Sequence, residues 1–108
     1  MEVREYLDAK GNSPFSKWFD RLNGTAAAKV ATVIHRLEQG NFSNVKGVGG
    51  GVYEYRIDFG PGYRIYFGRS GDLLVIVLAG GTKKRQDADI VSAKEYWKDY
   101  KRRKRKGV

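Results

Sequence analysis

Two arginines on neighbouring stretches of alternating sequence are the residues best suited to chemistry. Aromatic or aliphatic side chains occupy every second position of residues 52–59 and again of residues 63–68. These side chains must face the core, so Arg56 and Arg64 share the opposite side of a hairpin that turns at residues 60–62. Their backbones should lie within about 5–8 Å of each other. Two like charges so placed repel, and a phosphate between them would remove the repulsion and accept bidentate hydrogen bonds.

The same pattern has an interpretation that needs no ligand. Glu54 and Asp58 lie on the arginine side of the first strand. These carboxylates can neutralise both arginines through salt bridges across the strands. The local sequence favours phosphate binding and internal neutralisation about equally.

A basic segment after the third strand can add to this site. It consists of Lys83, Lys84, Arg85 and Gln86. Because it follows the apolar strand directly, its cations should lie near one rim of the sheet and can converge with Arg56 and Arg64. Tyr66 shares the arginine face and can stack on a base or donate a hydrogen bond to phosphate. The alternatives are a solvated loop and a partly exposed strand aromatic.

The residue types that are missing narrow the chemistry. The chain has no cysteine and a single histidine, His35, which we expect at a helix surface. Thiol catalysis, disulfides and histidine or cysteine metal clusters are thereby excluded, and no acidic metal-binding constellation or serine–histidine pair stands out. The glycine-rich residues 41–51 lack the ending of a P-loop. Arginine and lysine suit cleavage of RNA without a metal or cofactor, in which the 2′-hydroxyl attacks its own phosphate and cations stabilise the growing charge. A lysine can serve as base there if neighbouring positive charge lowers its pKa.

Helical periodicity predicts a hairpin of two helices in the first half of the chain. Ser13 and Pro14 are typical of a helix start, and Gly24 ends this helix. Thr25 can cap the second helix, and Gly40 stands where a C-terminal glycine belongs.

The strands and the last helix complete an α+β domain of order β-α-α-β-β-β-α. Residues 2–7 alternate and predict a short strand, whereas residues 41–51 favour a flexible or irregular link into the sheet. Three strands with short turns then form an antiparallel meander, and residues 73–79 are apolar enough to be buried on both faces. Asp87 or Asp89 can cap a last helix that packs on the domain through Ile90, Ala93, Trp97 and Tyr100.

The positive charge is concentrated at one end of the chain. Residues 101–108 carry six positive and no negative charges, so without them the net charge of +9 falls by six, to +3. We therefore divide the chain into one domain of residues 1–100 and a basic C-terminal tail of residues 101–108. Residues 1–10 lack the apolar region of a signal peptide, and no apolar run is long enough to span a membrane. We expect a cytoplasmic protein without membrane contact.

Three segments together resemble the RelE/ParE superfamily of bacterial toxins. They are Val52-Tyr53-Glu54-Tyr55-Arg56-Ile57, Gly62-Tyr63-Arg64-Ile65-Tyr66-Phe67 and Gly81-Thr82-Lys83-Lys84. The likeness covers nearly the whole chain and is closest to the HigB-like, or phage Gp49-like, "addiction module killer" branch. It implies a RelE-like fold and the toxin component of a type II toxin–antitoxin system, held inactive by an antitoxin that is often a helix-turn-helix protein.

The resemblance also implies an activity and a site. Many members cleave mRNA in the A site of translating ribosomes, as endoribonucleases that use no metal. Arg56 and Arg64 fall on a basic residue and a phosphate-contacting arginine of the family's hairpin, and Lys83 falls on or beside a basic residue after the last strand. These three are therefore the expected catalytic residues, and the expected RNA-binding residues are Tyr66, Lys84, Arg85 and Gln86.

Two departures from the family pattern affect the groups that transfer protons. RelE has a base-stacking tyrosine near the start of its final helix, where this chain reads Asp87-Ala88-Asp89-Ile90. The histidines of HigB-type toxins are also missing, and Tyr66 can substitute as the stacking group. Two other functions stay open: inhibition of DNA gyrase without nuclease activity, as in ParE, and plain nucleic-acid binding through the tail. Within the toxin interpretation, the tail should raise affinity for ribosomal RNA without setting cleavage specificity.

Overall fold

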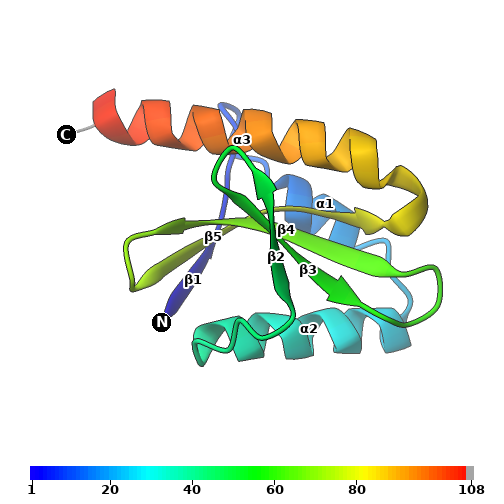
Figure 1. Ribbon diagram of the computed structural model, residues 1–108. Helices are drawn as coiled ribbons and strands as arrows, with labels where there is room; N and C mark the ends of the chain where they lie inside the picture. Colours follow the sequence, from blue (N-terminus) through cyan, green and yellow to red (C-terminus); the bar gives the residue numbers. More distant parts are fainter. Residues whose placement is uncertain (107–108) are drawn as a thin grey trace.

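A five-stranded mixed sheet separates two layers of helices. The computed structural model describes residues 1–106, and the last two residues of the predicted tail lie outside the described part. Figure 1 shows α2 and α3 on opposite sides of the sheet. The elements in chain order are β1 (Glu2–Glu5), α1 (Pro14–Phe19), α2 (Gly24–Glu38), β2 (Val45–Gly49), β3 (Val52–Ile57), β4 (Tyr63–Ser70), β5 (Leu74–Thr82), the short 3₁₀ helix η1 (Lys83–Arg85) and α3 (Gln86–Lys106).

The strand order across the sheet is β1-β5-β4-β3-β2. The predicted meander of β3, β4 and β5 is confirmed, because both of its pairs are antiparallel. The first strand pairs with β5 in parallel, with Glu2 opposite Leu74 and Glu5 opposite Val77. β5 therefore has a neighbour on each side and is buried on both faces, as its unbroken apolar sequence predicts.

The prediction of an irregular link over residues 41–51 was wrong for its central part. Residues 45–49 form β2, which pairs antiparallel with β3 at the edge of the sheet. Val45 and Val48 are half-buried and pack on the core, which is enough to hold a short strand despite its glycines. The glycines belong to the turn into β3, where Gly49 to Gly51 all have positive φ angles.

The helix ends follow the sequence signals only in part. Ser13 caps α1 as predicted, and its hydroxyl accepts the Ser16 N–H at 3.0 Å. The cap of α2 is Asn23 and not Thr25, because Asn23 is extended and its side chain accepts the Ala26 N–H at 2.9 Å. Gly40 follows the helix with a φ of +77°, as expected for a C-terminal glycine.

The start of the last helix also differs from the prediction. Neither Asp87 nor Asp89 is its cap, because the chain already turns in η1 after Thr82, and both aspartates lie in the first turn of α3. Negative charge at that end suits the helix dipole. The helix continues without a break through residues 101–106 of the predicted tail.

Two apolar cores lie on the two faces of the sheet. The core beneath α1 and α2 confirms the predicted aromatic side of the hairpin and contains Phe15, Val30, Val33, Leu37, Tyr55, Ile65, Phe67, Val75 and Val77. The core beneath α3 contains Tyr6, Val52, Tyr66, Ile76, Leu78, Ala79, Ala93 and Trp97. The last helix therefore covers the same face of the sheet that carries the two arginines, so this face is only partly open to solvent. No helix within residues 1–106 is both long and apolar enough to cross a membrane.

Candidate functional site

Arg56 and Arg64 are direct partners in the register of β3 and β4. This confirms the geometry predicted from the alternation. The turn between the strands uses Gly60 and Gly62, with φ angles of +54° and +76°, which let the chain reverse without shifting the register. Both guanidinium groups therefore lie on one face at the same end of the hairpin.

Glu54 lies between the two arginines and contacts both. Arg56 Nε donates to its Oε1 at 2.7 Å, and Arg64 Nε is 3.9 Å from its Oε2. Gln86, at the start of α3, donates its Nε2 to the same Oε2 at 2.8 Å. Internal neutralisation by Glu54 thus occurs, whereas Asp58, the other carboxylate considered for this role, forms no ion pair within the described residues.

The Glu54 carboxylate is fully buried and remains ionised. Burial alone would raise its pKa, but hydrogen bonds from Arg56 and Gln86 and the charge of both arginines outweigh burial and hold the pKa below its usual value. A buried carboxylate with three partners fixes their positions. Glu54 therefore orients both arginines. The sequence predicted only a neutralising role for it, as the alternative to phosphate binding.

Arg64 is buried and incompletely satisfied. Its side chain is 8% exposed, and its Nη1 donates to the Gly62 carbonyl at 3.2 Å. Its Nε is buried without a hydrogen-bond partner in the described part of the chain. Buried donors are nearly always paired, and this one faces the Glu54 carboxylate at 3.9 Å, so the ion pair compensates the buried charge.

The basic segment after β5 lies beside the arginines. The backbone N–H of Lys83 donates to the Gly62 carbonyl at 2.8 Å, the same oxygen that Arg64 contacts. Arg56, Arg64, Lys83 and Gln86 are therefore brought to one corner of the sheet. Lys84 and Arg85 are exposed at its edge, where Arg85 Nε lies 3.9 Å from Asp89 Oδ1.

Tyr66 does not offer a surface for stacking. Its ring is completely buried in the core beneath α3, so a base cannot reach it in this structure. Burial, together with the nearby charges of Glu54 and Asp89, raises the pKa of its hydroxyl. The sequence pattern correctly put Tyr66 on the arginine face but could not indicate that α3 covers that position.

Asp89 is a second carboxylate that the sequence did not single out for chemistry. Its side chain is 17% exposed, and its Oδ2 is buried without a partner among residues 1–106. The carboxylate lies against Gly81, where a Cβ would come within 1.9 Å of Oδ2, and Gly81 is the register partner of Arg64. Burial raises the pKa of Asp89, although the charge of Arg85 opposes this effect. The sequence feature that could have pointed to Asp89 is the pair of glycines that interrupts an apolar strand just before the basic segment.

An open groove of about 220 Å³ begins at Arg56 and runs between β3 and α2. Lys29 and Arg36 of α2 line it, together with Tyr55 and Asp58. Arg36 Nη1 donates to the Tyr55 hydroxyl at 3.1 Å, which holds the arginine along the groove. The groove therefore carries three positively charged side chains, Lys29, Arg36 and Arg56, and one carboxylate, Asp58.

Groups suited to metal binding are not part of this site. Within residues 1–106, no three histidine, cysteine, aspartate or glutamate side chains are arranged so that they could hold a metal ion. His35 is exposed on α2, as predicted, and its Nδ1 lies 3.8 Å from Glu38.

The fold and the cationic corner define a RelE-like α+β protein. The chain belongs to the family described as "Phage derived protein Gp49-like (DUF891)", whose model matches residues 17–102. This is a RelE-like toxin family associated with toxin–antitoxin modules. The chain is also 44% identical over 89 residues to an uncharacterized protein of Haemophilus influenzae, across 82% of this chain and 90% of the relative.

Proposed function

We propose that this protein is the toxin of a type II toxin–antitoxin system and cleaves mRNA on translating ribosomes without a metal. The observation that carries the proposal is the cross-strand pair Arg56 and Arg64, both held by Glu54, with the Lys83 backbone beside them. These groups form a pre-set anion site of the kind that stabilises a phosphorane-like transition state. Membership of a toxin family supports the cellular role.

The two arginines would have different roles in binding the phosphate. Arg56 is half-exposed and meets the RNA first, whereas Arg64 is held in a low-dielectric position where its charge acts more strongly on a bound oxygen. Glu54 keeps both guanidinium groups in place before the substrate arrives. Lys83 adds a third charge at the rim, and Lys84, Arg85 and Gln86 contact the neighbouring RNA.

In the proposed reaction, the RNA 2′-hydroxyl loses its proton to solvent water, its oxygen forms a bond to the adjacent phosphorus, and the bond to the 5′-oxygen breaks. The products are a 2′,3′-cyclic phosphate and a 5′-hydroxyl, whose oxygen takes up a proton. Asp89 is our candidate for the donor, because burial raises its pKa and Gly81 brings its carboxyl beside Arg64. A donor of this type would compensate for the missing histidines.

The proposed partners are mRNA, the ribosome and a cognate antitoxin, which we expect to be a helix-turn-helix protein. An antitoxin that covers the corner around Arg56 would block access to the RNA. The association of the family with toxin–antitoxin modules supports such a partner.

The test is cleavage of a defined mRNA in a purified translation system, mapped by primer extension. We expect cuts with the unmodified protein and a loss of at least about 100-fold with Arg56→Ala or Arg64→Lys, because each change weakens the oxyanion site. Arg4→Ala is the matched control, since Arg4 is an exposed arginine on β1 that pairs with Glu2. Thermal melting of each variant separates loss of fold from loss of chemistry.

Two outcomes would overturn the nuclease proposal. Intact mRNA at toxin concentrations that stop growth, combined with inhibited DNA supercoiling, would select a ParE-like gyrase inhibitor. Cleavage that survives in a folded Arg56→Ala and Arg64→Lys double variant would show that the catalytic site lies elsewhere.

A further inference from the structure

A second cationic site lies at the other end of α3. A groove of about 580 Å³ separates the end of this helix from the β4–β5 turn. Its lining contains no carboxylate and consists of Arg69, Ser70, Gly71, Trp97, Tyr100, Lys101, Lys104 and Arg105. The groove and the Arg56–Arg64 corner are separated by most of the 21-residue helix, or roughly 25 Å.

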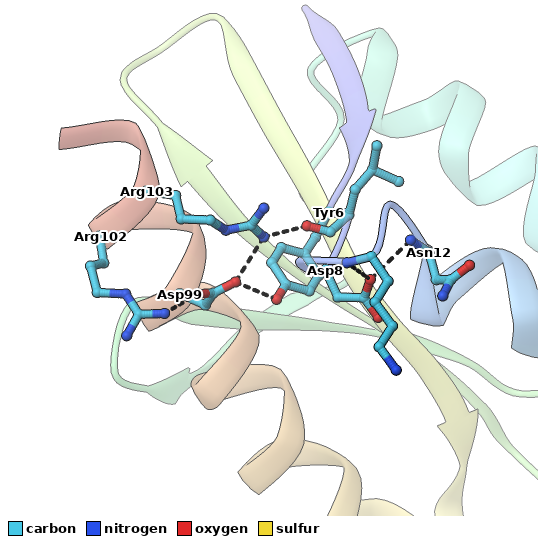
Figure 2. A network of polar contacts seen from close by, with 8 residues as sticks. Tyr6, Asp8, Asn12, Asp99, Arg102 and Arg103 are labelled. Atoms are coloured by element: carbon cyan, nitrogen blue, oxygen red, sulfur yellow. Dashed lines mark hydrogen bonds and ion pairs between the residues drawn. The ribbon is translucent and has the colours of Figure 1, made fainter. Parts of the chain in front are cut away.

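The charges of the last helical turns are sorted between two faces. Figure 2 shows Asp99 together with Arg102, Arg103 and Tyr6. Asp99 forms ion pairs with Arg102 and Arg103, the second at 2.7 Å. Arg103 also donates to the Leu7 carbonyl, which ties this face of the helix to the segment that follows β1.

The groove face, in contrast, carries positive charge without acidic partners. Lys101, Lys104 and Arg105 form no ion pair with any residue that the structure describes. Lys101 lies three positions before Lys104 and four before Arg105, so their repulsion destabilises the helix, although the helix dipole offsets part of this cost. Arg69 also lines the groove, but its guanidinium lies 4.3 Å over the Phe42 ring, which packs on the core beneath α1 and α2, so its charge is directed away from the groove.

Aromatic rings form the floor beneath these charges. Trp97 and Tyr100 are stacked with their centroids 5.3 Å apart and their planes 5° from parallel. Trp97 can lie against the sheet only because residue 68 is glycine, where a Cβ would come within 2.5 Å of the indole. Lys101 lies over the Trp97 ring at 5.6 Å, and Lys104 over the Tyr100 ring at 5.9 Å.

We propose that this groove binds the sugar-phosphate backbone of folded RNA as a second contact, separate from the Arg56–Arg64 corner. Unneutralised cations at helical spacing match a run of phosphates, and a half-exposed tyrosine beside them can meet a sugar or a base. An acidic peptide fits less well, because β4 and β5, whose turn lines the groove, are interior strands and offer no open edge to pair with a peptide backbone. The choice of RNA rests on the proposed function, but binding at the groove can be measured without cleavage.

The spacing of the two sites gives them different partners. A few nucleotides of message can occupy the Arg56–Arg64 corner but cannot reach the groove at the same time. An RNA structure tens of ångströms long can contact both. The groove would therefore add affinity for a large folded RNA and leave the choice of cleavage position to the corner.

The test compares two double variants that lose the same charge from the same helical turns. Lys101→Gln with Lys104→Gln alters the groove, and Arg102→Gln with Lys106→Gln is the matched control outside it. Binding of a fluorescent 20-base-pair RNA hairpin is followed by anisotropy over a range of salt concentrations, with gels to verify that the probe stays intact. We expect the groove variant to lose about tenfold in affinity and to lower the salt slope by about 1.4 to 1.8, and the control to change the slope by much less.

Two other sets of results would overturn the proposal. Equal losses in both variants would mean that overall charge drives binding and would overturn the groove, as would no loss in either. Tighter binding of a fluorescent polyglutamate peptide than of the hairpin, reversed by the groove variant, would make the partner a protein. Cleavage in the translation assay depends on the Arg56–Arg64 corner alone. Absence of cleavage would overturn the nuclease proposal, but RNA binding at the groove could still be measured and interpreted.

Discussion

Arg56 and Arg64 face each other across two strands, yet the first side chain is 48% exposed and the second only 8%. The difference arises because α3 covers the Arg64 side of the hairpin, and Glu54 contacts both guanidinium groups from beneath. One arginine is therefore accessible to a ligand, and the other is fixed in a protected position. This asymmetry leads to predictions that can be checked without knowing the substrate.

Replacement of Glu54 should destabilise the protein by about 3 kcal/mol, because Glu54→Gln leaves Arg64 buried without a counter-charge. Urea unfolding followed by circular dichroism measures the change. Asp58→Asn is the control, since this carboxylate is exposed and forms no ion pair in the described chain, and it should change stability by less than about 0.5 kcal/mol. Equal effects of the two substitutions would contradict the central position of Glu54.

The pH dependence of stability should follow Glu54. Its pKa is lower in the folded protein than in the unfolded chain, so its contribution is complete above the unfolded pKa of about 4.3 and is lost as pH falls through the folded value. Urea midpoints of the unmodified protein should decline more steeply between about pH 5 and pH 3 than those of Glu54→Gln. Parallel declines would show that the carboxylate is not favoured in its charged form.

Tyr6 should titrate late and hold the end of α3. Burial and its hydrogen bond to Asp99, at 2.6 Å, raise its pKa to about 12. Its stabilising effect is therefore complete below the unfolded pKa of about 10 and is lost as pH rises from there through the folded value of about 12. Absorbance at alkaline pH should show one tyrosine fewer ionising near the upper end of the range in Tyr6→Phe, and this variant should lose about 1 kcal/mol at neutral pH. An unchanged alkaline titration would contradict the assignment.

Gly81 should tolerate no side chain. In Gly81→Ala the new Cβ would fall within 1.9 Å of Asp89 Oδ2, so the first turn of α3 must shift away from the sheet. We expect a loss of about 1–3 kcal/mol and a fall in cleavage, because Asp89 and Gln86 move together. Gly24→Ala is the control, since nothing lies within 4 Å of that position and its φ is not positive. Thermal melting and the translation assay measure the two effects.

The hairpin and its arginine register could be predicted because a two-residue period and a short turn leave few alternatives. The covering of this site by the last helix could not be predicted in the same way. The stripe of Ile90, Ala93 and Trp97 predicts that a helix packs on the domain, but it does not say which face of the sheet receives it. The burial of Glu54, Arg64 and Tyr66 depends on which face the helix covers. It therefore could not be predicted from the local sequence pattern.

The edge strand β2 was missed for a different physical reason. Its sequence offers Val45 and Val48 among glycines, and glycine weakens a strand prediction through its entropy cost. Pairing with β3 and contact with the core supply the stability that the local sequence lacks. Asp89 was overlooked because its proximity to Gly81 depends on how η1 turns the chain into α3.

The parallel pairing of β1 with β5 has a consequence for synthesis. Glu2 leaves the ribosome long before its partner Leu74 has been made. Contacts this distant in sequence form slowly and cannot form before both segments exist. Gln86, which completes the set of groups around Glu54, emerges later still. A nascent chain therefore lacks both its finished sheet and its assembled cationic corner until Leu74 and Gln86 have left the ribosome.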